Sequence, residues 1–233
     1  MVAGSDTPTL PACLPDDLAR TAMERAKLYG LLANLFRREP GPDLLNQLRD
    51  PGFHDLLSET GIDLGDEFFS DPLDDVRDRL QVEYTFLFLG PGKHISPHES
   101  VQLKRGRGIL WGEETSIVKQ FMAAAGFNLD ETANEIPDHI GVELEFLSHL
   151  STKEAEAWQA GDHQAAAAAL GWQHRFVSNN IGKWVGRFCR EVEAAAETPF
   201  YAEFAKLLRS FIAGEKAEIA DRLSIADANS SGS

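Results

Sequence analysis

The sequence predicts an all-α protein, a single helical domain of two lobes joined by a hinge. Long segments carry apolar side chains at helical spacing, as at Leu18, Ala22, Ala26, Tyr29, Leu32 and Phe36. Proline and glycine stand where these segments end or begin, as at Gly90-Pro-Gly92 and Thr198-Pro199. The chain has no internal repeat and no series of alternating strands, which leaves helices as the expected elements.

The first helix is expected to begin at Asp16 or Asp17, because an aspartate side chain can cap free N–H groups. It runs to Phe36, and Glu39-Pro-Gly-Pro42 stops it. Two short helical pieces are expected next, from Asp43 to Arg49 and from Gly52 to Glu59.

A stronger helix opens at Asp71-Pro72, with an inward face that includes Leu80 and Tyr84, and ends at Gly90. Lys93 to Gly108 is expected to be an irregular loop. Gly112 to Ala125 is helical again, and its inward side chains are expected to be Ile117, Phe121 and Met122.

The C-terminal part is predicted to hold three helices. They are expected from Pro137 to Ala160, from Gly161 to Ala196, and from Thr198-Pro199 onward. The polar connection of residues 126–137 is long for a helical bundle and predicts the hinge between the lobes.

The domain is expected to span residues 16–227. Residues 1–15 are rich in proline, serine, threonine and glycine, which predicts a disordered tail, and residues 228–233 are expected to form a second one.

Composition narrows the function classes. The net charge of −15 argues against nucleic acid as a main partner and favours a basic one, although an acidic surface also simply keeps proteins in solution. No apolar stretch approaches a membrane span and no secretory signal is evident, so no membrane insertion and a cytoplasmic location are expected. Cys13 and Cys189 support neither a disulfide framework nor a zinc site.

The segment Glu135-Ile-Pro-Asp-His-Ile-Gly-Val-Glu-Leu-Glu-Phe146 combines a helix start with titratable side chains. Asp138 is expected to accept from the free N–H groups of the first turn, as the cap or one residue inside it. His139 has two readings: a structural histidine paired with Glu143 or Asp138, or a binding residue.

Catalytic motifs are weak throughout. Gly90-Pro-Gly-Lys93 is followed by His94 rather than Ser or Thr and is preceded by no strand, which excludes a phosphate loop. The enzymatic alternative is a helical-bundle metalloenzyme with a carboxylate and histidine site. Di-iron bundles use Glu-x-x-His on two helices, whereas Glu135–His139 and Glu145–His149 are spaced by four on one helix, and His-Glu-x-x-His is absent.

A peptide site fits the sequence better. The region from Tyr84 to Ser100 is aromatic and proline-rich, so it forms either core plus loop or a groove for a peptide. Gly108 to Asp162 holds eleven acidic residues against two lysines. An apolar groove beside such an acidic stretch suits a peptide that carries arginines and a hydrophobic run.

Two separated motifs resemble the TorD/DmsD family of redox-enzyme maturation chaperones. The first is Tyr84-Thr-Phe-Leu-Phe-Leu-Gly-Pro91 with Ile95-Ser-Pro-His-Glu-Ser-Val101, and the second is Glu135 to Phe146. Their order, their separation and the segment Thr198-Pro-Phe-Tyr201 agree with the family, and the resemblance spans residues 16 to 225.

The resemblance implies a cytoplasmic all-helical chaperone without catalytic turnover and without a cofactor of its own. Such proteins bind the twin-arginine signal peptide and apo form of a molybdopterin-containing oxidoreductase, aid cofactor insertion and delay export. The resemblance also implies a monomer or a homodimer, with lobe exchange as one form of the dimer.

The signal-peptide site implied by the matching positions falls on both motifs. It comprises Tyr84, Phe88, Gly90, Pro91, Pro97, His98, Glu99, Ser100, Glu135, Asp138, His139 and Glu143. Some relatives carry tryptophan where this chain has His98, which is a departure at the loop. In physical terms, Glu135, Asp138 and Glu143 are expected to take the two guanidinium groups, and an apolar groove the hydrophobic run.

Overall fold

The computed structural model describes residues 15–90, 92–103, 110–129 and 135–230. Within these ranges every regular element is a helix, which confirms the all-α prediction. Pro91 and most of the two expected tails lie outside the described residues. Among the described residues, no helix combines the length and apolar character that crossing a bilayer requires.

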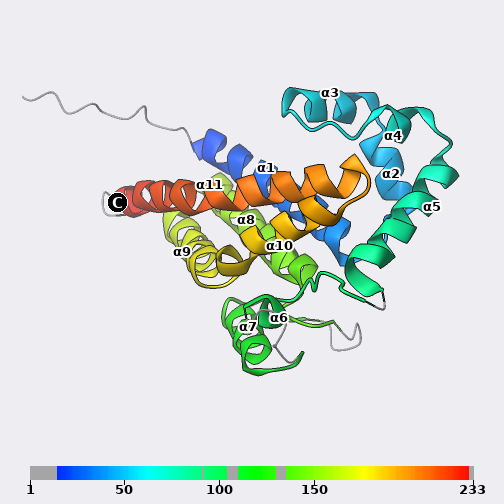
Figure 1. Ribbon diagram of the computed structural model, residues 1–233. Coiled ribbons are helices and arrows are strands. Elements are labelled where there is room, and N and C mark those ends of the chain that lie inside the picture. Colours follow the sequence, from blue (N-terminus) through cyan, green and yellow to red (C-terminus); the bar gives the residue numbers. More distant parts are fainter. Residues whose placement is uncertain (1–14, 91, 104–109, 130–134, 231–233) are drawn as a thin grey trace, which may run out of the picture.

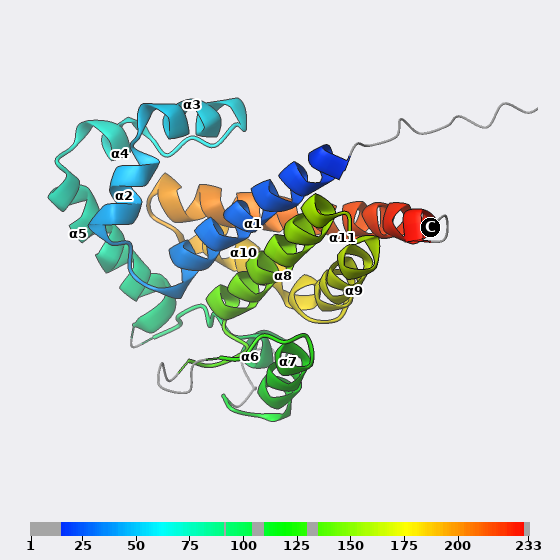
Figure 2. The same ribbon diagram turned by 180° about the vertical axis from the view of Figure 1, so that it is seen from behind.

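Five helices form the centre of the molecule (Figures 1 and 2). They are α1 (Pro15–Arg37), α8 (Ile140–Ala160), α9 (His163–Asn179), α10 (Ile181–Ala195) and α11 (Pro199–Ser230). Helices α1 and α8 lie side by side, α9 packs against α8, and α11 packs against α9 and α10. The α1 helix matches the segment predicted from its apolar stripe, and α11 continues to Ser230, into the segment expected as a tail.

The prediction of one helix from Gly161 to Ala196 is wrong. Asn180 has φ −120° and ψ −100°, which breaks the segment into α9 and α10. Gly182 allows the turn, because a Cβ at this position would lie 2.2 Å from the carbonyl oxygen of Val177. The break lets the second half of the segment fold back along the bundle.

Four helices lie at one side of the bundle (Figure 1). They are α2 (Pro42–Leu48), α3 (Pro51–Glu59), α4 (Asp66–Ser70) and α5 (Leu73–Tyr84). The two short pieces predicted before Glu59 are therefore confirmed.

Helix α5 continues into one π-helical turn, η1 (Thr85–Leu89). The turn closes where the N–H of Gly90 donates to the carbonyl of Thr85 over 2.7 Å. A Cβ at Gly90 would lie 3.2 Å from that same oxygen, so glycine suits the end of the turn. A π-turn changes the direction of the side chains that follow it, and such turns are frequent at functional sites.

Two helices project from the lower end of the bundle (Figures 1 and 2): α6 (Glu99–Leu103) and α7 (Glu113–Ala124). The first corrects the expectation of an irregular loop from Lys93 to Gly108, within which residues 104–109 lie outside the described part. In α7 the prediction of an inward Ile117 is wrong, since this side chain is exposed whereas Val118 and Met122 are buried. The ring of Phe121 contacts Phe146 of α8.

The hinge remains a prediction. Helix α7 ends at Ala124 and Gly126 adopts φ +83°, a conformation that favours glycine. Residues 130–134 of the expected connection lie outside the described part of the chain.

A buried ionic network ties four of the central helices together. Arg25 of α1 donates to Glu154 of α8 over 2.8 Å and to Glu215 of α11 over 2.6 Å. The same guanidinium donates to Gln173 of α9 over 2.6 Å, and the Tyr29 hydroxyl donates to Glu215 over 2.8 Å. Because each charge has a partner, the network can persist in a dry interior.

Candidate functional site

The two sequence motifs meet through backbone hydrogen bonds. The N–H of Ile140 donates to the carbonyl of Pro97 over 2.8 Å, and the N–H of Glu99 donates to the carbonyl of Asp138 over 2.9 Å. Between these bonds His98 and His139 form an isolated antiparallel bridge, with their ring centroids 5.0 Å apart. The fold therefore brings both motifs into one structure, as a shared site requires.

Asp138 caps a different helix from the one expected. Its carboxylate accepts from the N–H of Ser100 over 2.9 Å. Asp138 therefore caps the short α6 helix, although it lies far from α6 in the sequence. The α8 helix begins at Ile140, and its cap is His139, whose Nδ1 accepts from the N–H of Gly141 over 3.1 Å. The placement of Asp138 in the first turn of α8 is thus wrong, because α6 uses its carboxylate.

Two further carboxyl groups are buried behind the bridge. Glu143 is fully buried, and the indole N–H of Trp184 donates to it over 3.3 Å. Burial, reinforced by Glu99 and Asp138, raises the pKa of Glu143 well above its usual value. Burial also raises the pKa of Glu99, an effect that hydrogen bonds with Glu143 and Asn180 partly offset. Glu143 therefore holds a proton at a pH where an exposed glutamate would have lost it.

The raised pKa of Glu143 predicts a pH-dependent effect of Glu143→Gln. Above pH of about 4.5, the unfolded chain loses the Glu143 proton while the folded protein keeps it, which favours unfolding increasingly as pH rises. Glutamine stays neutral and still accepts from Trp184. The variant is expected to gain stability relative to the wild type as pH rises from 5 to 8, by at most about 1.4 kcal/mol per pH unit.

Urea unfolding at pH 5, 6, 7 and 8 measures this gain. Glu156→Gln, at an exposed position of the same helix, controls for the removal of one carboxylate. A constant difference between the Glu143→Gln and wild-type free energies of unfolding would contradict the prediction.

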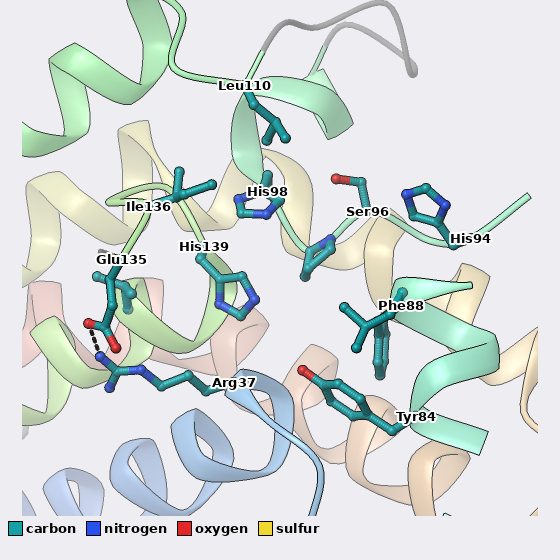
Figure 3. Close-up of a pocket in the computed structure, with 13 residues that line it drawn as sticks. Arg37, Tyr84, Phe88, His94, Ser96, His98, Leu110, Glu135, Ile136 and His139 are labelled. Carbon is teal, nitrogen blue, oxygen red and sulfur yellow. Dashed lines mark hydrogen bonds and ion pairs between the residues drawn. The ribbon is translucent and has the colours of Figure 1, made fainter. Parts of the chain in front are cut away.

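A pocket of about 470 Å³ opens in front of the histidine bridge. It is lined by Arg37, Tyr84, Phe88, Leu89, His94, Ser96, Pro97, His98, Leu110, Glu135, Ile136, His139 and Val142. Figure 3 shows the rings of Tyr84 and Phe88 at one end and the Arg37–Glu135 pair at the other. In that view His139 and His98 lie above these groups, and Leu110 lies higher still. The pocket thus has an aromatic end and a charged end.

Six of the twelve predicted site residues line this pocket: Tyr84, Phe88, Pro97, His98, Glu135 and His139. Gly90 lies beside it, at the end of η1. Four others are buried and form no part of its wall, namely Glu99, Ser100, Asp138 and Glu143. Pro91 lies outside the described residues. The buried residues support the wall, because they hold the two backbone segments together.

The aromatic end is rigid. The Phe88 ring packs against Tyr84, Phe188 and Tyr201 at centroid distances of 4.9, 6.0 and 5.9 Å. The Tyr84 hydroxyl donates to the carbonyl of Phe36 over 3.3 Å, and burial raises its pKa to about 12. A ligand therefore meets fixed apolar walls at this end.

The charged end contains a residue that the sequence did not single out. Arg37, the last residue of α1, pairs with Glu135 and with Glu145, the latter over 2.6 Å. Burial, together with the nearby His98 and Arg37, lowers the pKa of His139 to about 3, so His139 is uncharged at neutral pH. Arg37 lies 98 residues before Glu135, and no local pattern connects them.

An exposed apolar stripe adjoins the pocket. Val82, Phe86 and Leu89 lie on one face of α5 and η1 and are 71%, 59% and 61% exposed. Leu89 also lines the pocket, which makes the stripe continuous with it. Exposed apolar side chains grouped in this way are typical of interaction surfaces.

The described residues give no support to the alternative of a helical-bundle metalloenzyme. Among the described residues, no group of three or more histidine, cysteine, aspartate and glutamate side chains is arranged to hold a metal ion. His98 Nδ1 and Asp138 Oδ1 approach to 3.9 Å, but they form a pair rather than a ligand set.

Comparisons with known proteins agree with the motif resemblance. Residues 50–190 match the family model described as nitrate reductase delta subunit. The chaperone protein TorD of Vibrio parahaemolyticus is 26% identical over 199 residues, which cover 81% of this chain and 91% of the relative. TorD of Shewanella pealeana is also 26% identical, over 206 residues that cover 81% and 86% of the two chains.

Similarity extends to solved structures. One of them is a crystal structure from Archaeoglobus fulgidus whose name is that of a candidate redox enzyme maturation protein, with a TM-score of 0.48 and 23% identity, covering 89% of this chain and 98% of that one. The relatives named as chaperones support a chaperone role for this protein. On the family match over residues 50–190, the chain belongs to the nitrate reductase delta subunit family, which includes the TorD-like chaperones of redox enzymes.

Proposed function

We propose that the protein is a cytoplasmic chaperone that binds the twin-arginine signal peptide of a molybdopterin-containing oxidoreductase precursor. It holds the apo-enzyme while the cofactor is inserted and delays its export. The observation that carries the proposal is the pocket itself, in which an apolar stripe leads into a cavity that ends at the Glu135 carboxylate and its partner Arg37. The family match and the chaperone relatives support the same reading.

The apolar part suits the hydrophobic run of a leader. Val82, Phe86 and Leu89 have the spacing of one helix face, so a peptide helix can lie along them and bury their exposed surface. Leu110, which is 44% exposed, extends the apolar surface to the opposite side of the pocket. Burial of such side chains contributes about 25 cal/mol for each Å² removed from water.

The carboxyl groups at and behind the pocket suit the two arginines of a leader. Glu135 faces the pocket and is accessible, whereas Asp138 and Glu143 are fully buried. We therefore assign direct contact with a guanidinium to Glu135 and give Asp138 and Glu143 the role of positioning the wall. Charge-assisted bonds between guanidinium and carboxylate groups add both strength and geometry.

Calorimetric titration with a synthetic twin-arginine leader tests the proposal. Phe86→Ser and Leu89→Ser are each expected to weaken binding about tenfold, since each removes an exposed apolar contact worth about 1.5 kcal/mol. Leu56→Ser is the matched control, because Leu56 is 52% exposed on the distant α3 helix. Equal affinities of all three variants and the wild type would contradict the proposed surface, and an absence of binding to the wild type would contradict the function.

A co-purification experiment identifies the client. The wild-type protein is expected to retain a molybdoenzyme precursor that carries its leader, and to lose it when the leader is deleted. If the protein also retained the leaderless precursor, we would assign its contact with the precursor to a surface other than the proposed leader site.

A further inference from the structure

The guanidinium of Arg37 already occupies the charged end of the pocket. Its Nη1 donates to Glu145 over 2.6 Å and its Nη2 donates to Glu135. One carboxylate precedes α8 and the other lies in its second turn, so the guanidinium bridges two acids of the same segment. In Figure 3 the Arg37 side chain extends from α1 toward Glu135, below His139.

The packing of α1 against α8 brings Arg37 to this position. Gly141 sits directly against its stem, and a Cβ on Gly141 would lie 2.6 Å from the Cβ of Arg37. The stem is thus fixed by close contact between the helices, while the guanidinium continues past them to the two acids. Only the outer part of the side chain is free to change partners.

The three charged groups are accessible from solvent. The side chains of Arg37, Glu135 and Glu145 are 23%, 28% and 46% exposed. An ion pair of this kind exchanges partners at low cost, because water can solvate each charge during the change. The buried Arg25 network differs in this respect, since its side chains are at most 6% exposed.

We propose that Glu135 and Glu145 form a subsite for one leader arginine, and that Arg37 is its resident occupant, which the leader displaces. This inference rests on the proposed function. The two acids hold a planar guanidinium through separate N–H groups, a geometry that arginine supplies and lysine does not. The affinity for the leader then depends on how much more strongly the two acids bind the leader guanidinium than that of Arg37. Arg37 therefore lowers the affinity for the leader. It also favours arginine-bearing peptides, because a cation that binds the acids more weakly does not displace it.

Removal of the resident guanidinium tests the subsite. In calorimetric titrations, Arg37→Gln is expected to bind the twin-arginine leader about tenfold more tightly than the wild type, a difference of about 1.4 kcal/mol. Arg38→Gln is the matched control, because the neighbouring Arg38 is exposed and carries the same charge. Its affinity is expected to stay within about twofold of the wild type, since an exposed single charge contributes little.

Arg37→Lys separates displacement from net charge. Lysine keeps the positive charge but loses the planar fork, so it competes less well, and the variant is also expected to bind the leader more tightly than the wild type. A leader with two lysines in place of the arginines is expected to gain less from Arg37→Gln than the twin-arginine leader does. Thermal unfolding of each variant verifies that the fold is retained.

Two results would overturn the inference. An Arg37→Gln variant that is folded and binds no more tightly than Arg38→Gln would show that Arg37 does not compete with the leader. Equal gains for the twin-arginine and twin-lysine leaders would show a general charge effect. A wild-type protein that binds neither leader would instead contradict the proposed function, so the two failures are distinguishable.

Discussion

Replacement of Arg25 by methionine is expected to lower the free energy of unfolding by about 3–5 kcal/mol. The change leaves Glu154 and Glu215 buried without their cationic partner, and the energetic cost of burying an unpaired charge dominates the loss. Methionine fills much of the volume of the arginine stem, so little of the effect comes from a cavity. Chemical denaturation followed by far-UV circular dichroism measures the difference.

Arg20→Ala provides the matched control for this prediction. Arg20 lies on the same helix and pairs with Asp17 and Glu24, but its side chain is 65% exposed. Its removal is expected to change stability by less than about 1 kcal/mol. Similar losses in both variants would show that the buried network does not stabilise the bundle more than a surface pair does.

Asp138→Ala is expected to cost about 2–3 kcal/mol and to weaken binding of the leader. The change removes the carboxylate that accepts from Ser100 and leaves that N–H buried without its partner. It also loosens α6 and the segment around Pro97, which forms part of the pocket wall. Asp138→Asn keeps an acceptor oxygen at this place and is expected to lose less stability than Asp138→Ala.

Asp162→Ala removes an exposed helix cap and is the control for Asp138→Ala, which removes a buried one. The Asp162 carboxylate accepts from the N–H of Ala165 over 2.9 Å at the start of α9, and its loss is expected to cost about 1 kcal/mol without a change in leader affinity. Urea unfolding and calorimetric titration measure both quantities. If Asp138→Ala cost no more than Asp162→Ala, the buried cap would not anchor α6.

The helices were predictable where one continuous apolar stripe decides the structure. The α1 helix and the α5–η1 helix follow from such stripes, and both were predicted with their ends near the observed ones. The break at Asn180 was not, because the apolar pattern continues through it and the turn depends on a close approach between Gly182 and Val177. This approach is local, between residues five apart in the sequence, and apolar periodicity does not report it.

The site was predictable in its motifs but not in the depth of its side chains. The residues Tyr84 to Ser100 and Glu135 to Phe146 do meet, and half of the predicted residues line the pocket. Asp138 and Glu143 were expected to face a ligand, but both are buried. Their burial depends on the pairing of two segments that are distant in the sequence, which sequence spacing does not reveal. Arg37 was missed for the same reason, since its partners are 98 and 108 residues away.

The pairing of Pro97–Ser100 with Asp138–Ile140 closes the base of the segment that carries α6 and α7. The chain that carries α6 and α7 leaves the bundle and returns to it at one place, like an insertion with a closed base. We expect this segment to open locally at a free energy below that of global unfolding, once the contact of Phe121 with Phe146 of the bundle is released. A ligand that contacts both segments of the base stabilises the closed state by mass action. We therefore expect that occupancy of the pocket stabilises the packing of α7 against the bundle.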